Sequence, residues 1–434
     1  MGSSVRVKEA VVVTPSEPTP NCVLSLSALD SQLFLRFTVE YLLVYRPGPG
    51  LDKVATTSRL KAALAKALVP YYPLAGRVRP RSGNPGLEVV CKAQGAVFIE
   101  AVSDRYTVND FDKAPKTVAQ WRRLLSFSVP DVLNGSPPLI LQLTWLSDGG
   151  AALGVGISHC LTDGIGGSEF LNYVAELASG KHSGPKPKLI WDRHVFNFKP
   201  MTRDDYFIES HPEFNRVPDL CGGFLNRVTN HLRPTCIVFD KRRLTNLKTM
   251  AYRTCQISNS SSFTSFEVLA AHVWRSWARA IGFPPNQTLK LLLSVNIRNR
   301  VKPGLPDGYY GNAFVLGCAQ TSAKELTEKG IGYGSGLVKK AKERVDSEYV
   351  RKVTEIVSES RACPDSVGVL ILTQWSRMGL ERVEFGMEKP VFVGPICSDR
   401  YCVFLPVKGE RDSVKVMVAV PAAAFDNYHR FLRE

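Results

Sequence analysis

Two apolar runs joined by a short polar turn constrain the fold of this chain more than any other feature. Residues 139–146, LILQLTWL, place large apolar side chains on one face of a strand. Residues 151–158, AALGVGIS, are apolar almost throughout, and the SDGG between the runs contains the Asp-Gly pair that favours a tight hairpin. We therefore predict a β-hairpin whose second strand is largely buried.

The chain changes from strand to helix directly after this hairpin. His159 follows the second strand, Asp163 comes four residues later, and glycines occupy positions 164, 166 and 167. The following SEFLNYVAELASG has apolar residues at helical spacing and stops at Gly180. His159 is thus predicted at a strand-to-helix junction, a place where loops on rigid scaffolds often carry function.

The length and composition of the chain indicate two halves. A chain of 434 residues is long for one ordinary core. Residues 181–235 are rich in proline and lysine near their start and lack periodicity, which is typical of a crossover linker. A capping box at Thr264 and Glu267 then opens a new amphipathic helix. We predict an N-terminal domain at 1–180, the linker, and a C-terminal domain at 236–434.

Composition excludes several classes of protein. The chain is 44% hydrophobic and 22% charged, as soluble globular proteins are. No run approaches the roughly 18 apolar residues of a membrane helix, and the first residues lack the signal-peptide pattern. We therefore expect a cytoplasmic protein without a membrane span. The ten cysteines include no C-x-x-C pair, so we expect no structural metal site.

The net charge of +15 narrows the class of partner. Such a charge suits nucleic acid, an anionic membrane surface or a polyphosphate ligand. Lysine and arginine are spread along the chain, and no recognisable nucleic-acid module is present. A small ligand that carries phosphate groups is the most specific partner that this charge predicts.

The chemistry of His159 and Asp163 has several interpretations. A histidine titrates near pH 6.5, so His159 could take a proton from a hydroxyl or an amine, or it could be structural. Asp163 could orient the imidazole or anchor the turn through a buried ion pair. A metal half-site lacks a third ligand nearby, and the absence of a G-x-S-x-G elbow disfavours a serine hydrolase.

A resemblance to a known family joins these features. SHCLTDG resembles the H-x-x-x-D-G signature of the plant BAHD acyltransferases of specialised metabolism, which transfer acyl groups from coenzyme A to alcohols or amines. Further stretches resemble the family in the same order, namely PTPNCVLSLSALD, YYPLAGRV, TSFEVLAAHVWR, VNIRNRV, GYYGNA and LTQWSRMGLERVEFG. The stretch EFGMEKPVFVGPICSDRYCVFLPV resembles the alcohol-acyltransferase branch.

The resemblance implies a fold and a mechanism. It implies a two-domain α/β fold of the chloramphenicol-acetyltransferase type, with a channel between the domains. His159 would act as general base, so that an alcohol acceptor attacks the thioester of acyl-CoA directly. Asp163 would pair with Arg298 to hold the loop, and Gly164 and Glu384 would support the site. Acyl-CoA would be a co-substrate, with no permanently bound cofactor and no metal, and we expect a monomer.

The resemblance also implies a set of coenzyme A contacts and shows one departure. The implied contacts are Thr264, Ser265, Arg275, Thr373 and Trp375. The family's D-F-G-W-G motif appears here as EFGME, residues 384–388. N-acylation of an amine stays an alternative, because the same base serves both acceptors. The altered motif also leaves open a non-catalytic, BAHD-like binding protein.

Overall fold

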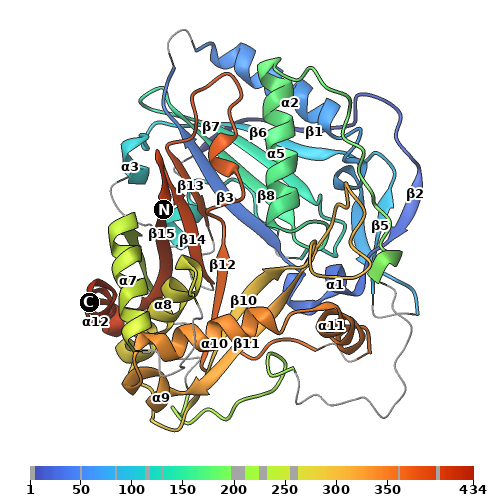
Figure 1. The fold of residues 1–434 in the computed structure, drawn as a ribbon. Helices are drawn as coiled ribbons and strands as arrows, with labels where there is room; N and C mark the ends of the chain where they lie inside the picture. Colours follow the sequence, from blue (N-terminus) through green and yellow to red (C-terminus); the bar gives the residue numbers. More distant parts are fainter. Residues whose placement is uncertain are drawn as a thin grey trace.

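Strands dominate the centre of the molecule, and helices cover them from outside (Figure 1). The computed structural model describes residues 5–48, 51–83, 86–112, 118–129, 131–196, 211–223, 232–254, 262–359, 362–396 and 401–434. Within these ranges the strands form two six-stranded sheets and one small three-stranded sheet. The three-stranded sheet has the order β2 (Cys22–Ser25), β5 (Leu87–Cys91) and β4 (Arg77–Pro80).

The first large sheet contains the predicted hairpin. Its strand order is β1 (Arg6–Val13), β6 (Ala96–Ser103), β7 (Leu139–Leu146), β8 (Ala151–Ser158), β3 (Thr38–Tyr45) and β13 (Phe392–Pro395). The hairpin prediction is confirmed, because β7 and β8 pair antiparallel from Leu139 opposite Ile157 to Trp145 opposite Ala151. All residues of both strands are buried, as expected for the interior of a sheet that is covered on both faces.

Helices and loops cover the two faces of this first sheet. On one face lie α2 (Lys53–Ala67) and α5 (Gly164–Ser179), which share a core with Leu141 and Leu143 (Figure 1). On the other face Trp121 and Leu124 pack with Leu42. The described residues also contain three short helices from the first part of the chain, namely α1 (Ala28–Ser31), α3 (Asn109–Asp112) and α4 (Val118–Arg122).

The second large sheet carries most of the remaining helices. Its order is β11 (Phe314–Ser322), β10 (Thr288–Asn296), β12 (Val369–Gln374), β14 (Tyr401–Val407), β15 (Glu410–Pro421) and β9 (Leu232–Phe239). Its helices are α7 (Lys241–Arg253), α8 (Ser265–Ile281), α9 (Ala323–Glu328), α10 (Ile331–Glu343), α11 (Ser347–Glu359) and α12 (Phe425–Arg433). Figure 1 shows α7, α8, α10 and α12 grouped beside this sheet.

The helix starts that the sequence predicts have local causes. The Thr264 side chain accepts a hydrogen bond from the Glu267 backbone N–H, and the Glu267 carboxylate accepts one from the Thr264 N–H. This capping box satisfies two donors that the first turn of α8 cannot pair internally. At the other junction Asp163 is the N-cap of α5, and Gly180 ends the helix with a φ of 67°.

The strands depart from the predicted domain limits at two places. β13 pairs antiparallel with β3 in the first sheet, although it was predicted as part of the C-terminal domain. β9 begins at Leu232, inside the predicted linker. Pairing between distant strands leaves no local periodicity in the sequence, so the sequence could not indicate these two features. Of the predicted linker, residues 197–210 and 224–231 lie outside the described residues.

The helices also bear on the expected absence of a membrane span. Among the residues with described positions, no helix combines the length and the apolar character that crossing a membrane requires.

Candidate active site

The end of β8 and the neighbouring strand β3 hold His159 in place. The backbone N–H of His159 donates to the carbonyl of Phe37 at 3.0 Å, which continues the sheet pairing by one residue. The imidazole lies between two aromatic rings, with centroid distances of 5.5 Å to Phe37 and 5.7 Å to Phe314. His159 is half-buried and lines the large cavity described below. The C-terminal end of β8, an interior strand of the first sheet, therefore positions the imidazole.

The side-chain amide of Asn312 determines which nitrogen of His159 carries the hydrogen. The Asn312 Nδ2 donates to the His159 carbonyl at 2.7 Å and to Asp30 Oδ1 at 2.8 Å. Both partners only accept, so Asn312 Oδ1 must be the atom that faces His159 Nδ1 at 3.1 Å. We infer that Nδ1 donates this hydrogen bond, which leaves a lone pair on Nε2.

A fully buried carboxylate holds Asn312 in turn. Asp30 Oδ1 also accepts from the Asn312 backbone N–H at 2.9 Å, and Asp30 Oδ2 accepts from the Ser27 hydroxyl at 2.7 Å. Arg193 Nε lies 2.9 Å from Asp30 Oδ2 and balances the buried charge. Neither Asp30 nor Asn312 was predicted as a site residue. They lie 282 residues apart, and only their polar character within family-like stretches could have indicated them.

Asp163 binds Arg298, so the ion pair that the resemblance implied is present. Arg298 Nη1 lies 2.7 Å from Asp163 Oδ2, and Arg298 Nη2 lies 3.1 Å from Asp163 Oδ1. The same carboxylate accepts from the backbone N–H groups of Gly166 at 3.0 Å and Ala313 at 3.1 Å. Within the described residues, no hydrogen bond joins Asp163 to His159. Of the two interpretations of Asp163, this geometry favours the anchor of the turn.

Burial sets the protonation state of His159. Removal of the ring from water lowers its pKa below the usual value of 6.5. Its own backbone hydrogen bond, the Asp163 charge, the Asn312 hydrogen bond and the Asp30 charge each oppose that shift without reversing it. The imidazole is therefore neutral near pH 7, and a neutral imidazole can accept a proton.

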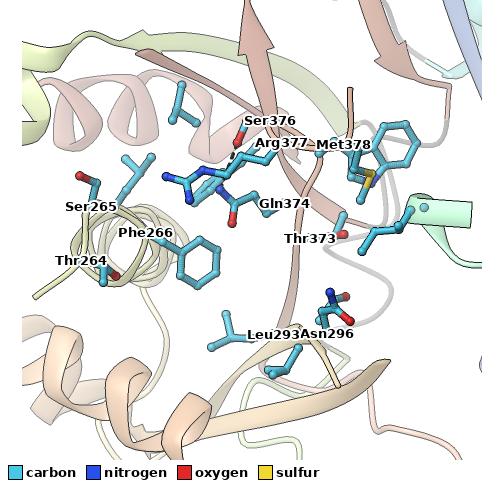
Figure 2. Close-up of a pocket in the computed structure, with 18 of the residues that line it drawn as sticks. Thr264, Ser265, Phe266, Leu293, Asn296, Thr373, Gln374, Ser376, Arg377 and Met378 are labelled. Atoms are coloured by element: carbon cyan, nitrogen blue, oxygen red, sulfur yellow. Dashed lines mark hydrogen bonds between the residues drawn. The ribbon is translucent and has the colours of Figure 1, made fainter. Parts of the chain in front are cut away.

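A cavity of about 1210 Å³ reaches His159 from the second sheet. Figure 2 shows that the start of α8, strand β10 and the end of β12 contribute side chains to a common space. Of the predicted coenzyme A contacts, the structure brings four together here, namely Thr264, Ser265, Thr373 and Trp375. A cavity of this size exceeds the usual range for a drug-sized ligand, about 300–1,000 Å³, and so has room for two substrates.

Basic side chains that were not predicted individually line the same cavity. They come from α7, α10, the loop after β10, the segment after β12 and β15, and they are Lys241, Lys248, Arg300, Lys342, Arg377 and Arg411. Two of them have acidic partners, since Lys342 lies 2.6 Å from Glu267 and Lys241 lies 3.2 Å from Asp412. We call these six residues the basic mouth. Only the net charge of the chain had pointed to such a cluster.

Arg275, the fifth predicted coenzyme A contact, lies elsewhere. Its guanidinium donates to the Thr327 carbonyl at 2.8 Å, and it is not among the residues that line the cavity. Arg275 follows Ser265 by ten residues on α8, which places it roughly 15 Å further along the helix axis. Arg275 therefore does not line the cavity with the other four predicted contacts, and its role in coenzyme A binding stays a prediction.

The two predicted supporting residues lie in different places. Gly164 opens α5 and lines the cavity, and a Cβ added there would lie 2.6 Å from Met378 Cε, so the flexible Met378 side chain would have to move. Glu384 lies outside the cavity and pairs with Lys181, just after the end of α5. Phe385 beside it is buried against Tyr45, with ring centroids 4.9 Å apart. Glu384 of the EFGME motif thus lies near the C-terminal end of α5, whereas His159 lies near its N-terminal end.

Comparison with known proteins agrees with this geometry. The model of the Transferase family matches residues 3–430, nearly the whole chain. The chain belongs to the BAHD acyltransferases. Omega-hydroxypalmitate O-feruloyl transferase of Arabidopsis thaliana is 32% identical, with 97% of this chain and 91% of the relative covered. Alcohol acyl transferase 1 (allele GSa) of Malus domestica is 31% identical, with 97% and 92% covered.

Solved structures share the fold of this BAHD member. Vinorine synthase superposes with a TM-score of 0.75 at 21% identity, covering 98% of this chain and 96% of that chain. F. sporotrichioides TRI101, in complex with coenzyme A and T-2, superposes with a TM-score of 0.71 at 16% identity, covering 94% and 97%. The predicted family, enzyme class and two-domain acyltransferase fold are confirmed.

Proposed function

We propose that the protein transfers an acyl group from acyl-CoA to the hydroxyl of an alcohol, with His159 as the general base. The observation that carries this proposal is the contact of His159 Nδ1 with Asn312 Oδ1, from which we infer a lone pair on Nε2, at a cavity that also contains the basic mouth. The relatives named as an O-feruloyl transferase and an alcohol acyl transferase support a hydroxyl acceptor.

The basic mouth suits the charged part of the donor. Coenzyme A carries several phosphate charges, which lysine and arginine side chains bind through charge-assisted hydrogen bonds. Thr264 and Ser265 lie at the N-terminal end of α8, where backbone N–H groups and the helix dipole favour an anion. Thr373, near the end of β12, and Trp375, directly after that strand, line the same cavity, which also reaches His159. The donor would extend along this cavity to His159.

The reaction needs one base that later acts as an acid. His159 Nε2 takes the hydroxyl proton while the acceptor oxygen forms a bond to the thioester carbon. The tetrahedral intermediate then breaks its carbon–sulfur bond, and the imidazolium returns the proton to the coenzyme A thiolate. The products are an ester and free coenzyme A, and no covalent acyl-enzyme forms. Asn312 Oδ1 can accept from Nδ1–H in both protonation states of the ring, so the ring keeps its orientation throughout.

A panel assay tests this proposal. Aliphatic and aromatic acyl-CoAs are mixed with alcohols or with amines, and the release of free thiol is followed. We expect turnover with an alcohol, and we expect His159→Ala to reduce it about 10²–10⁴-fold, the usual contribution of a general base. His182→Ala is the matched control, because His182 binds Glu176 and is not among the cavity residues. An unimpaired His159→Ala enzyme would contradict the proposal, and turnover with amines alone would favour N-acylation.

The predicted location and oligomeric state stay predictions. We propose that the protein is a cytoplasmic monomer. Cell fractionation and size-exclusion chromatography test these two points directly.

A further inference from the structure

The hydroxyl of Tyr41 is a hydrogen-bond donor that the protein leaves unused. Only 3% of the Tyr41 residue is exposed, and it lines the cavity with its ring edge-on to Trp375 at 5.5 Å. Among the described residues, none forms a hydrogen bond with the Tyr41 hydroxyl. Burial raises the pKa of Tyr41 well above its usual range, so the hydroxyl keeps its proton and can donate. Because Tyr41 lines the cavity, an oxygen of a bound ligand could accept a hydrogen bond from this hydroxyl.

The wall between His159 and Tyr41 is apolar. Phe37 lies opposite His159, Val39 opposite Ile157, and Tyr41 opposite Val155. Residues two apart on a strand share a face, and four residues along β3 span roughly 13 Å. A group that extends from His159 to Tyr41 therefore passes Val39 and Ile157, both of which line the cavity. This wall suits a slender apolar group whose far end is polar.

The first turn of α5 adds donors beside the Tyr41 hydroxyl. A Cβ placed on Gly167 would lie 3.8 Å from the Tyr41 hydroxyl oxygen, so the start of α5 and the phenol are neighbours. The N–H groups of Gly166 and Gly167 already bind Asp163, whereas no described residue accepts from those of Gly164 and Ile165, which line the cavity. The helix dipole also presents its positive end here. Backbone N–H groups only donate hydrogen bonds, so the start of α5 suits a ligand oxygen that accepts one.

Acyl-CoA is the ligand that would reach the part of the cavity beside Tyr41. One continuous cavity includes the basic mouth, His159 and Tyr41. If the phosphates of acyl-CoA bind at the mouth and the thioester lies at His159, the acyl group continues towards Tyr41. We propose that Tyr41 is a specificity-determining residue that donates a hydrogen bond to an oxygen at the far end of the acyl group. This inference rests on the proposed function, because that function places the thioester at His159.

Binding of unreactive donor analogues tests the inference without a known acceptor. The probes are coenzyme A thioethers with a 3-phenylpropyl group, in which the para position of the ring carries hydrogen, hydroxyl or carboxylate. Isothermal titration calorimetry measures the dissociation constant of each probe for the wild-type protein and for Tyr41→Phe. We expect the wild-type protein to bind at least one oxygen-bearing probe about 3- to 10-fold more tightly than the unsubstituted probe. We expect Tyr41→Phe to lose that preference.

The comparison of the probes identifies the kind of oxygen and the cause of the preference. A larger gain for carboxylate assigns an anionic end, and a larger gain for hydroxyl assigns a neutral one. Tyr173→Phe, which removes a phenol hydroxyl on α5 outside the cavity, should keep the wild-type ratio. A ratio that Tyr41→Phe leaves unchanged, or a wild-type protein without a preference, overturns the inference alone. If none of the probes and no free coenzyme A bind, the proposed function fails as well.

Discussion

At the scale of single residues, Asn312 decides the chemistry of His159. Its amide is oriented by two acceptors, the His159 carbonyl and Asp30, and this orientation places a hydrogen on His159 Nδ1. The carboxylate of the H-x-x-x-D motif has a different task, because Asp163 binds Arg298 and two backbone N–H groups. The His159 imidazole and the loop that carries it are thus held by different side chains.

Removal of the Asn312 amide should change the pH profile as well as the rate. Asn312→Ala should lower kcat/KM about 10²-fold, because the ring loses its orientation. The lost hydrogen bond favours the protonated ring, so its removal should lower the pKa of His159 further. In the wild-type enzyme kcat/KM should fall with decreasing pH only below about 6.5, and in Asn312→Ala this fall should move to lower pH. If the rate falls but the pH below which kcat/KM declines stays the same, Asn312 has only a structural role.

At the scale of secondary-structure elements, the ion pair of Asp163 and Arg298 joins α5 to the end of β10. The Asp163 side chain is 7% exposed and that of Arg298 is 20% exposed. Asp163 is also the N-cap of α5, so its carboxylate both caps the helix and forms the ion pair with Arg298. The loop that carries His159 therefore depends on a contact across the two sheets.

Loss of this ion pair should affect stability more than chemistry. Asp163→Asn should lower the free energy of unfolding by about 2 kcal/mol, less than for a fully buried pair because Arg298 is partly exposed. Urea unfolding of Asp163→Asn, Arg298→Gln and the double variant gives the coupling between the two residues. Normal stability with lost activity in Asp163→Asn would instead favour direct orientation of His159.

Elements with local causes could be predicted from the sequence, and contacts between distant segments could not. The hairpin of β7 and β8 follows from its turn and its apolar runs, and the start of α8 follows from its capping box. The addition of β13 to the first sheet depends on pairing with β3, some 350 residues earlier in the chain. The contact of Asn312 with Asp30 likewise exists only in the folded molecule.

At the scale of the whole molecule, the net charge of +15 has a local meaning. Six basic residues from five parts of the fold line one cavity, although lysine and arginine are spread along the sequence. The sequence therefore indicated a phosphate-bearing ligand but not the place where it binds. The fold brings the basic mouth, from the second half of the chain, to the histidine at the end of the first sheet.

The basic mouth predicts that salt and charge removal weaken coenzyme A binding. Arg377 lines the cavity beside the end of β12 (Figure 2), and Arg377→Ala should raise the dissociation constant for coenzyme A about 3- to 10-fold. Raising the ionic strength should weaken wild-type binding, because salt screens the phosphates from the mouth. Lys8→Ala, on the edge strand β1, should bind coenzyme A as the wild type does. Salt-independent binding would contradict this assignment of the mouth.

The central claim is that His159 presents a free lone pair on Nε2 near neutral pH, ready to take the acceptor proton. The ¹⁵N chemical shifts of histidine-labelled protein at pH 7 test this claim directly, with His159→Gln to assign the signals. We predict a neutral ring with the hydrogen on Nδ1 and none on Nε2. A ring that is protonated at both nitrogens, or that carries its hydrogen on Nε2, would contradict the account.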